Sequence, residues 1–274
     1  MERDLYQKIE YSTRYLLSEG GLIKSIFPNI GREYLYGNEL IYADLHCHPY
    51  IENEDDLRGV LRSSVRNWMG IIGWTKHVGS DEKDYFDMKD ILVKSSIKYN
   101  DKGLAVFVPT CGEIPLVVLG NYETNVKVKG LKEGASLDML ALMPDIGFRK
   151  TTRNGMPLDE FLDVADHYKA IKLLAHACVL PVEWKIPFRS PEKEELEFLR
   201  REIIPKIDGA DEVADATLWM SCSWDQDYYS GQHTLRSSDA HTRIVKGLKN
   251  IPLVNSLIKS YLRNEIGRAY TMFN

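Results

Sequence analysis

Two histidines separated by a single residue follow the first apolar run of the chain. The stretch "LIYADLHCHP" contains His46 and His48, and the acidic run "ENEDD" comes shortly after it. Residues two apart on a β-strand point to the same side, so both imidazoles face together while Cys47 faces away. The later stretch "SSDAH" gives Asp239 and His241 the same spacing. Neutral imidazoles and ionised carboxylates bind Zn, Mn or Fe, and a carboxylate has two oxygens with which to bridge ions.

More histidines and acids stand at or near the ends of further predicted strands. His77 ends "GIIGWTKH" (70–77), and Glu113 falls at the end of "LAVFVPTCGEI" (104–114). Asp138 lies within "SLDMLALMP" (136–144), and His176 falls at the end of "AIKLLAHA" (170–177). Active sites of parallel barrels are built at the carboxyl ends of the strands, where distant segments meet. The joint pattern therefore predicts a multinuclear metal site at one rim.

Helical patterns separate these strands, and two short strands follow at 210–217 and 234–241. Apolar residues at helical spacing predict helices over 55–70, 86–101, 157–167 and 192–204. His167 is predicted on a solvated helix face, and His233 is interpreted as structural. Alternating strands and helices indicate a parallel sheet covered by helices. No glycine-rich turn follows the first strand, as a Rossmann sheet would require, so a barrel is preferred.

The composition restricts the class of function. Of 274 residues, 44% are apolar and 27% charged, which is typical of a globular protein, and the net charge is −5. That charge makes long nucleic acid a less attractive substrate than a small phosphate ester or a short oligonucleotide. No run approaches the ~18 apolar residues of a membrane span, so no membrane partner is expected. Four scattered cysteines without a CxxC pair suit reduced thiols, and we expect a cytoplasmic protein.

The motifs "DLHCHP", "WTKH", "TCGEI", "LLAHA" and "RSSDAH" occur in an order that resembles the PHP (polymerase and histidinol phosphatase) domain family. The resemblance covers about residues 40–245. It implies an α/β fold, a distorted TIM-like barrel of seven parallel strands with outer helices. It also implies two or three divalent transition metals (Zn, Mn or Fe) that serve phosphoester hydrolysis. Residues 1–39 are then an N-terminal extension, and residues 40–274 form a single barrel domain.

The resemblance also implies a ligand set. The first metal would be bound by His46, His48 and Asp239, with Glu113 bridging it to the second. His176 would bind the second metal, with Asp138 standing where the family often has a histidine. The third metal would be bound by His77 and His241, joined by Glu54 or Asp55. An acidic cap of the following helix is the alternative interpretation of that acidic run.

The family resemblance predicts that a metal-bound water near Glu113 and Asp239 attacks a small phosphorylated substrate. Cations should bind the phosphate, and the candidates are Lys76, Arg149, Lys150, Arg153 and Arg236. Lys76 departs from the family's usual aspartate and would either contact the phosphate or discourage a metal nearby. Cys111 stands where the family usually has glycine. The alternatives are an amidohydrolase-like C–N hydrolase and a degenerate, non-catalytic barrel that binds metal or phosphate.

Overall fold

The protein was analysed as a computed structural model, which describes residues 41–67, 69–79, 98–99, 104–107, 116–132, 135–145, 147–175, 180–181, 188–189, 191–215, 220–221, 234–242, 262–263, 266–267 and 271–273. The expected N-terminal extension, Glu113, His176 and His233 lie outside these residues. Of the helix expected over 86–101, the structure describes Lys98–Tyr99, which form a short strand.

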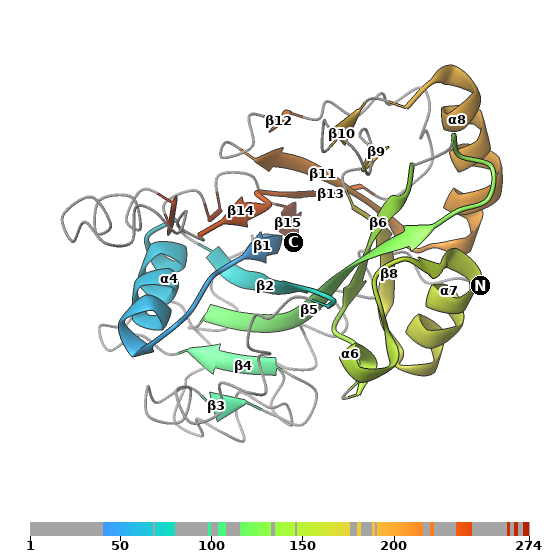
Figure 1. The fold of residues 1–274 in the computed structure, drawn as a ribbon. Helices are drawn as coiled ribbons and strands as arrows, with labels where there is room; N and C mark the ends of the chain where they lie inside the picture. Colours follow the sequence, from blue (N-terminus) through green and yellow to red (C-terminus); the bar gives the residue numbers. More distant parts are fainter. Residues whose placement is uncertain are drawn as a thin grey trace.

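The molecule is built on one large, strongly curled sheet with a small two-stranded one beside it (Figure 1). Its main hydrogen-bonded path runs β12-β11-β8-β6-β5-β2-β1-β14. The strands of this path are β1 (Ile41–His48), β2 (Met69–His77), β5 (Leu116–Lys127), β6 (Leu137–Leu142), β8 (Ile171–Leu174), β11 (Gly209–Asp215), β12 (Met220–Ser221) and β14 (Ala240–His241). The others are β3 (Lys98–Tyr99), β4 (Leu104–Phe107), β7 (Met156–Pro157), β9 (Leu180–Pro181), β10 (Phe188–Arg189), β13 (Thr234–Ser237) and β15 (Thr271–Phe273).

The strands of the curled sheet run in both directions. β1, β2 and β5 are parallel, whereas β6 is antiparallel to both β5 and β8. The α/β class is therefore confirmed, but the sheet is a mixed, half-barrel sheet and not a clear barrel of seven parallel strands. Connection length explains the reversal, because only residues 128–136 join β5 to β6. A parallel pair needs a crossover of roughly a dozen residues or more.

The segment from β13 to β14 runs from the β11 side of the sheet to its β1 side. β13 pairs in parallel with β11, and β14 pairs in parallel with β1 through Cys47↔Ala240 and His48↔His241. Between these strands Asp239 adopts a left-handed conformation with φ 48°. Its amide donates to the His46 carbonyl at 2.7 Å. Non-glycine residues adopt this conformation rarely and at a cost of about 1–3 kcal/mol, so the contacts around Asp239 must enforce it.

The register of β1 against β2 slips just where His46 is placed. Asp44 pairs with Ile72, but the next aligned pair is Cys47 with Trp74. A Cβ on Gly73 would lie 2.0 Å from the Leu45 carbonyl oxygen, so glycine is required there. The same carbonyl accepts a hydrogen bond of 2.9 Å from Asn121 Nδ2 of β5. Irregularities of this kind re-aim a side chain at functional sites, and here they fix the direction of His46.

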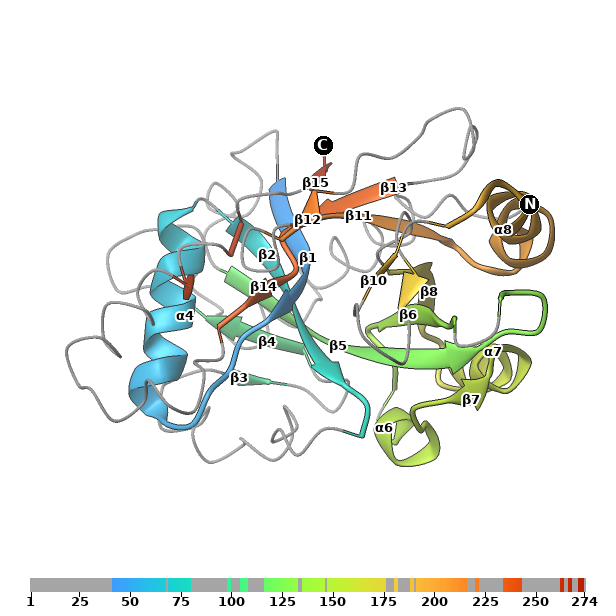
Figure 2. The same cartoon turned by 45° about the horizontal axis from the view of Figure 1, so that its top comes forward.

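The helices lie outside the sheet, with α4 on one side and α6, α7 and α8 on the other (Figure 2). Their bounds are α4 (Glu54–Arg66), α6 (Phe148–Thr151), α7 (Leu158–His167) and α8 (Lys193–Phe198), and α8 continues through the turns η2 (Leu199–Ile203) and η3 (Ile204–Lys206). Helix α4 begins at the N-cap Asn53 and buries Leu57, Val60 and Leu61 against the Cys47 side of β1. None of the described helices combines the length and the apolar character needed to cross a membrane.

Candidate metal centre

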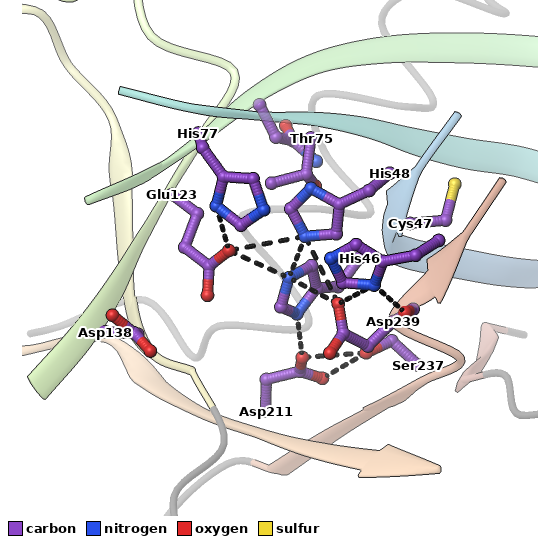
Figure 3. Close-up of polar contacts among 12 residues, drawn as sticks. His46, Cys47, His48, Thr75, His77, Glu123, Asp138, Asp211, Ser237 and Asp239 are labelled. Carbon is purple, nitrogen blue, oxygen red and sulfur yellow. Dashed lines mark hydrogen bonds and ion pairs between the residues drawn. The ribbon is translucent and has the colours of Figure 1, made fainter. Parts of the chain in front are cut away.

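Four donor atoms from three separate segments converge inside the curled sheet (Figure 3). His46 and His48 come from β1, Glu123 from β5, and Asp239 from the turn between β13 and β14. The Nε2 atoms of His46 and His48 are 2.9 Å apart. Asp239 Oδ1 lies 3.3 and 3.2 Å from them, and Glu123 Oε2 lies 3.8 and 3.3 Å from them. All four residues are buried, and we call them the inner donor set.

The spacing of His46, His48 and Asp239 suits three ligands of one transition-metal ion. Ligands about 2.0–2.1 Å from a tetrahedral Zn²⁺ lie about 3.3–3.4 Å from one another. The separations among His46, His48 and Asp239 are 2.9, 3.3 and 3.2 Å, close to that value. Glu123 Oε2 lies on the edge of this group, 3.8 and 3.3 Å from the two imidazoles. His46, His48 and Asp239 alone already form a group whose ligand atoms lie within 4.8 Å of one another. Two imidazoles and two carboxylates are a donor chemistry that Zn, Mn and Fe accept.

A second group lies beside the first and faces solvent. The His48 ring stacks against both His77 and His241, with centroids 4.2 and 4.3 Å away, and the rings of His77 and His241 are 5.7 Å apart. Ligand atoms of these three imidazoles also lie within 4.8 Å of one another. Glu123 Oε2 lies 2.9 Å from His77 Nδ1, so this carboxylate touches both groups. The side chains of His77 and His241 are 41% and 31% exposed, so the second group, which we call the outer donor set, opens to solvent.

A buried carboxylate orients His46 from behind. Asp211 Oδ2 on β11 lies 2.7 Å from His46 Nδ1, and Ser237 Oγ lies 2.7 Å from both Asp211 oxygens. An ionised carboxylate only accepts hydrogen bonds, so Nδ1 of His46 carries the proton and Nε2 is directed at the inner donor set. Such carboxylate–histidine pairs commonly hold metal ligands in place. Sequence reasoning missed Asp211, because "GADEVAD" offers three acids and only the folded strand selects one.

The buried charges shift the pKa values of the imidazoles in opposite directions. Burial disfavours the charged form of His46, but Asp239, Asp211 and Glu123 outweigh it and raise its pKa well above the usual range. Burial, together with the neighbouring His241 and His77, lowers the pKa of His48 to about 4. In the metal-free protein His46 is therefore charged and His48 neutral, which allows their Nε2 atoms to approach closely. Protons and metal compete for the same atoms.

The structure brings two carboxylates to the histidines: Asp239, which was predicted, and Glu123, which was not. Of the predicted third strand, the structure describes Leu104–Phe107 as β4, which pairs antiparallel with β5. Phe107 pairs with Leu116 at the start of β5, whereas Glu123 lies seven residues further along that strand. β5 was not predicted. Its signal was the alternation in "LVVLGNYETNVK", in which Tyr122 and Val126 face the core.

Two other acids predicted as ligands lie apart from the donor sets. Asp138 on β6 is half-buried and accepts a hydrogen bond of 3.0 Å from Asn125 Nδ2, and Figure 3 shows it beyond Glu123. Glu54 occupies the first turn of α4, where it pairs with Arg58 at 2.5 Å. The helix-cap interpretation of the acidic run therefore fits the structure. His167 is the last residue of α7 and is exposed, as predicted.

The basic residues predicted to bind phosphate are not gathered at the donor sets. Buried Lys76 alternates with His77 on β2 and donates to the Pro49 carbonyl at 3.2 Å, next to the Trp74 ring. Arg153 pairs with Glu160 at 2.6 Å, and exposed Arg236 alternates with Ser237 on β13. Arg149 and Lys150 belong to α6. This helix follows the end of β6 that lies beside Asn121, remote from Asn125 and Asp138, because β6 runs antiparallel.

Comparisons of the chain with protein-family models, with curated proteins and with solved structures found no match. The interpretation of the centre therefore depends on its own residues.

Proposed function

We propose that the protein is a metal-dependent phosphoesterase that acts on a small phosphate ester, a nucleotide or a short oligonucleotide. One observation carries this proposal: Glu123 Oε2 lies 3.3 Å from His48 Nε2 and 2.9 Å from His77 Nδ1. A single carboxylate thus contacts a buried donor set and a solvent-facing one. The resemblance of "DLHCHP" and "SSDAH" to the PHP family supports the same reaction class.

Each donor set would have its own task. The inner donor set binds one transition-metal ion in a site closed to solvent. Glu123, with the outer histidines His77 and His241, forms the partly exposed side on which a substrate can approach. Bound ions of this class lower the pKa of a water to about 7 and neutralise charge on a phosphoryl group. His176, which lies outside the described residues, remains a proposed ligand of the second ion, so two or three ions in total are proposed.

The orientation of the ligands comes from the protein itself. His46 is fixed by Asp211, as described above. The Asp239 carbonyl accepts from His241 Nδ1 at 2.8 Å, which leaves His241 Nε2 as its ligand atom. The turn that presents the Asp239 carboxylate thereby also orients an outer histidine. Ligands that are held in place before binding favour the coordination of an ion in one defined geometry over loose, non-specific cation binding.

Metal content and hydrolysis together test this proposal. Protein reconstituted separately with Zn²⁺, Mn²⁺ and Fe²⁺ should bind about two or three equivalents and should release phosphate from a panel of phosphomonoesters, diesters and nucleotides. Asp239→Asn should lose both metal and activity. Asp163→Asn, at an exposed position of α7, is the matched control and should keep both.

Other outcomes would select another function. Less than one equivalent of metal after reconstitution would favour the non-catalytic barrel. Hydrolysis of cyclic amides without any phosphate release would favour the amidohydrolase-like enzyme. Phosphate release that persists in Asp239→Asn would show that the activity has another source.

A further inference from the structure

One buried carboxylate lies beneath the donor sets without belonging to them. Asp44 is on β1 two residues before His46, where the register of β1 against β2 shifts. Asp44 is fully buried. It is not part of either group of residues whose ligand atoms cluster. Its carboxylate binds two segments that are distant in sequence from it and from each other.

The first of these segments is the turn that presents Asp239. The Ser238 amide donates to Asp44 Oδ1 at 3.0 Å, and the Ser238 hydroxyl donates to Oδ2 at 2.5 Å. The hydroxyl oxygen in turn accepts from the Ala240 amide at 3.1 Å. The residues before and after Asp239 are thus held through the same carboxylate, and the Asp239 amide is held by the His46 carbonyl. These contacts enforce the left-handed backbone that Asp239 adopts.

The second segment comes from the region after residue 260. The Gly267 amide donates to Asp44 Oδ2 at 2.8 Å, and Gly267 has φ 81°. The Ile266 carbonyl accepts from Asn67 Nδ2 just after α4, and Ile266 is buried in the core beside that helix. Arg263 Nη2 lies 2.7 Å from Asp56 of α4. Arg263 and Ile266 therefore contact α4 and the residue after it, while Gly267 binds Asp44.

We propose that Asp44 is the positioning residue of the candidate metal centre. By binding Ser238 and Gly267 together, it fixes the turn that places the Asp239 carboxylate against His46 and His48. The effect of Asp44 on metal affinity rests on the proposed function. Its effect on the order of the Asp239 turn does not. Asp44 itself contacts no ion and no substrate in this role.

Asp44→Asn is the sharpest substitution. The two backbone amides bind different carboxylate oxygens, so an asparagine can satisfy only one of them and turns an NH₂ group toward the other. The matched control is Glu195→Gln in α8. Glu195 is also buried and also accepts two backbone amides, from Lys132 at 3.1 Å and from Glu192 at 3.0 Å, but it contacts none of the donor residues through them.

Two measurements are needed. The amides of Asp239 and Thr242 donate to the carbonyls of His46 and His48 at 2.7 and 3.2 Å. In the metal-free protein, hydrogen exchange should show at least a tenfold loss of protection at these two amides in Asp44→Asn, and less than a twofold change there in Glu195→Gln. In a Zn²⁺ titration against a chelator, Asp44→Asn should raise the Kd at least tenfold, whereas Glu195→Gln should keep it within twofold.

The outcomes separate the two proposals. Unchanged protection of these amides in Asp44→Asn, or equal loss in Glu195→Gln, overturns the positioning role whether or not metal binds. Lost protection together with a wild-type protein that binds no Zn²⁺ supports the positioning role and overturns the metal proposal instead. If Asp44→Asn does not fold, Ser238→Ala decides, because it keeps the backbone amide and removes only the hydroxyl. It should lose protection at Asp239 by a smaller factor of about 3–10, and no loss overturns the proposal.

Discussion

His46 Nδ1 lies 2.7 Å from the buried Asp211 Oδ2, so one imidazole of the inner donor set is held by a carboxylate on a strand 165 residues away in sequence. This contact links β1 to β11 through the interior of the curled sheet. It fixes which nitrogen of His46 faces the metal site, and it holds negative charge behind a ligand. The strength of the centre should therefore depend on a residue that touches no ion.

Asp211→Asn tests this dependence. The amide cannot replace both the charge and the two acceptor oxygens, so Zn²⁺ affinity should fall about 10–100-fold. Competition with a chelator measures the affinity, and circular dichroism checks the fold. Asp208→Asn is a control. Asp208 lies three residues before Asp211, and its carboxylate accepts a hydrogen bond from the Lys172 amide. Equal losses in both variants would contradict a specific role for Asp211.

Glutamate substitutions separate the structural assignment from the sequence-based one. Glu123→Gln removes the oxygen charge that both donor sets share, and we expect it to lower phosphate release at least 100-fold and metal content by at least one equivalent. Glu113→Gln should change both by less than threefold. Assays on both purified variants with the same metal loading decide the question, and a reversed pattern would restore Glu113 as the bridging residue.

Metal binding should release protons. The pKa of His46 is raised well above its usual value in the metal-free protein. His46 therefore carries an extra proton at neutral pH, and this proton must leave when a metal binds Nε2. Affinity should rise up to about tenfold per pH unit below that raised pKa and become flat above it. Calorimetry in buffers of different ionisation enthalpy counts the protons, and a count near zero at pH 7 would contradict the shift.

Removing the metal should lower thermal stability. An ion present at 100 times its Kd stabilises the folded state by about 2.7 kcal/mol. For a chain of this size, that corresponds to a fall in Tm of roughly 5–10 °C on chelation. Thermal unfolding with and without chelator measures it. In Asp239→Asn the chelator should have no effect, and a similar fall there would point to an ion bound elsewhere.

Gly73→Ala should damage the centre from a distance. The added methyl group would lie 2.0 Å from the Leu45 carbonyl oxygen and 2.4 Å from Asn121 Nδ2. The backbone of β1 must therefore shift at Leu45, directly before His46. Overpacking of this kind typically costs about 1–3 kcal/mol. Urea unfolding and Zn²⁺ titration should both report a loss. Preserved stability and affinity together would show that the close approach of β1 and β2 is not needed.

The sequence predicted those parts of the fold whose pattern is local. Strand β1 and helix α4 follow from alternation and from helical spacing, and the facing of His46 with His48, away from Cys47, is confirmed. β5 was missed because its polar residues Asn121, Glu123 and Asn125 face the site while its apolar ones face the helices. Such a strand resembles a solvent-exposed one until the partner residues are known.

The misplaced cations have a topological cause. A parallel direction was expected for every strand, but the direction of β6 depends on its pairing with β5, a strand that was not predicted. Because β6 runs antiparallel, its start, with Asp138, pairs with Asn125, and its end, with Leu142, pairs with Asn121. Helix α6, which carries Arg149 and Lys150, therefore follows the end of β6 that pairs with Asn121. A parallel β6 would have brought Arg149 and Lys150 to the rim.

The pairing of β1 with late segments has a consequence for synthesis. Asp44 contacts Ser238 and Gly267, which are made 194 and 223 residues after it. At translation rates of about 5–20 residues per second, the two early histidines exist for roughly 10–40 s before Asp239 is made. The nascent chain thus presents incomplete ligands throughout that interval. On the proposed function, an ion can meet the complete inner donor set only after Asp239 has been made and the late segments have docked on β1.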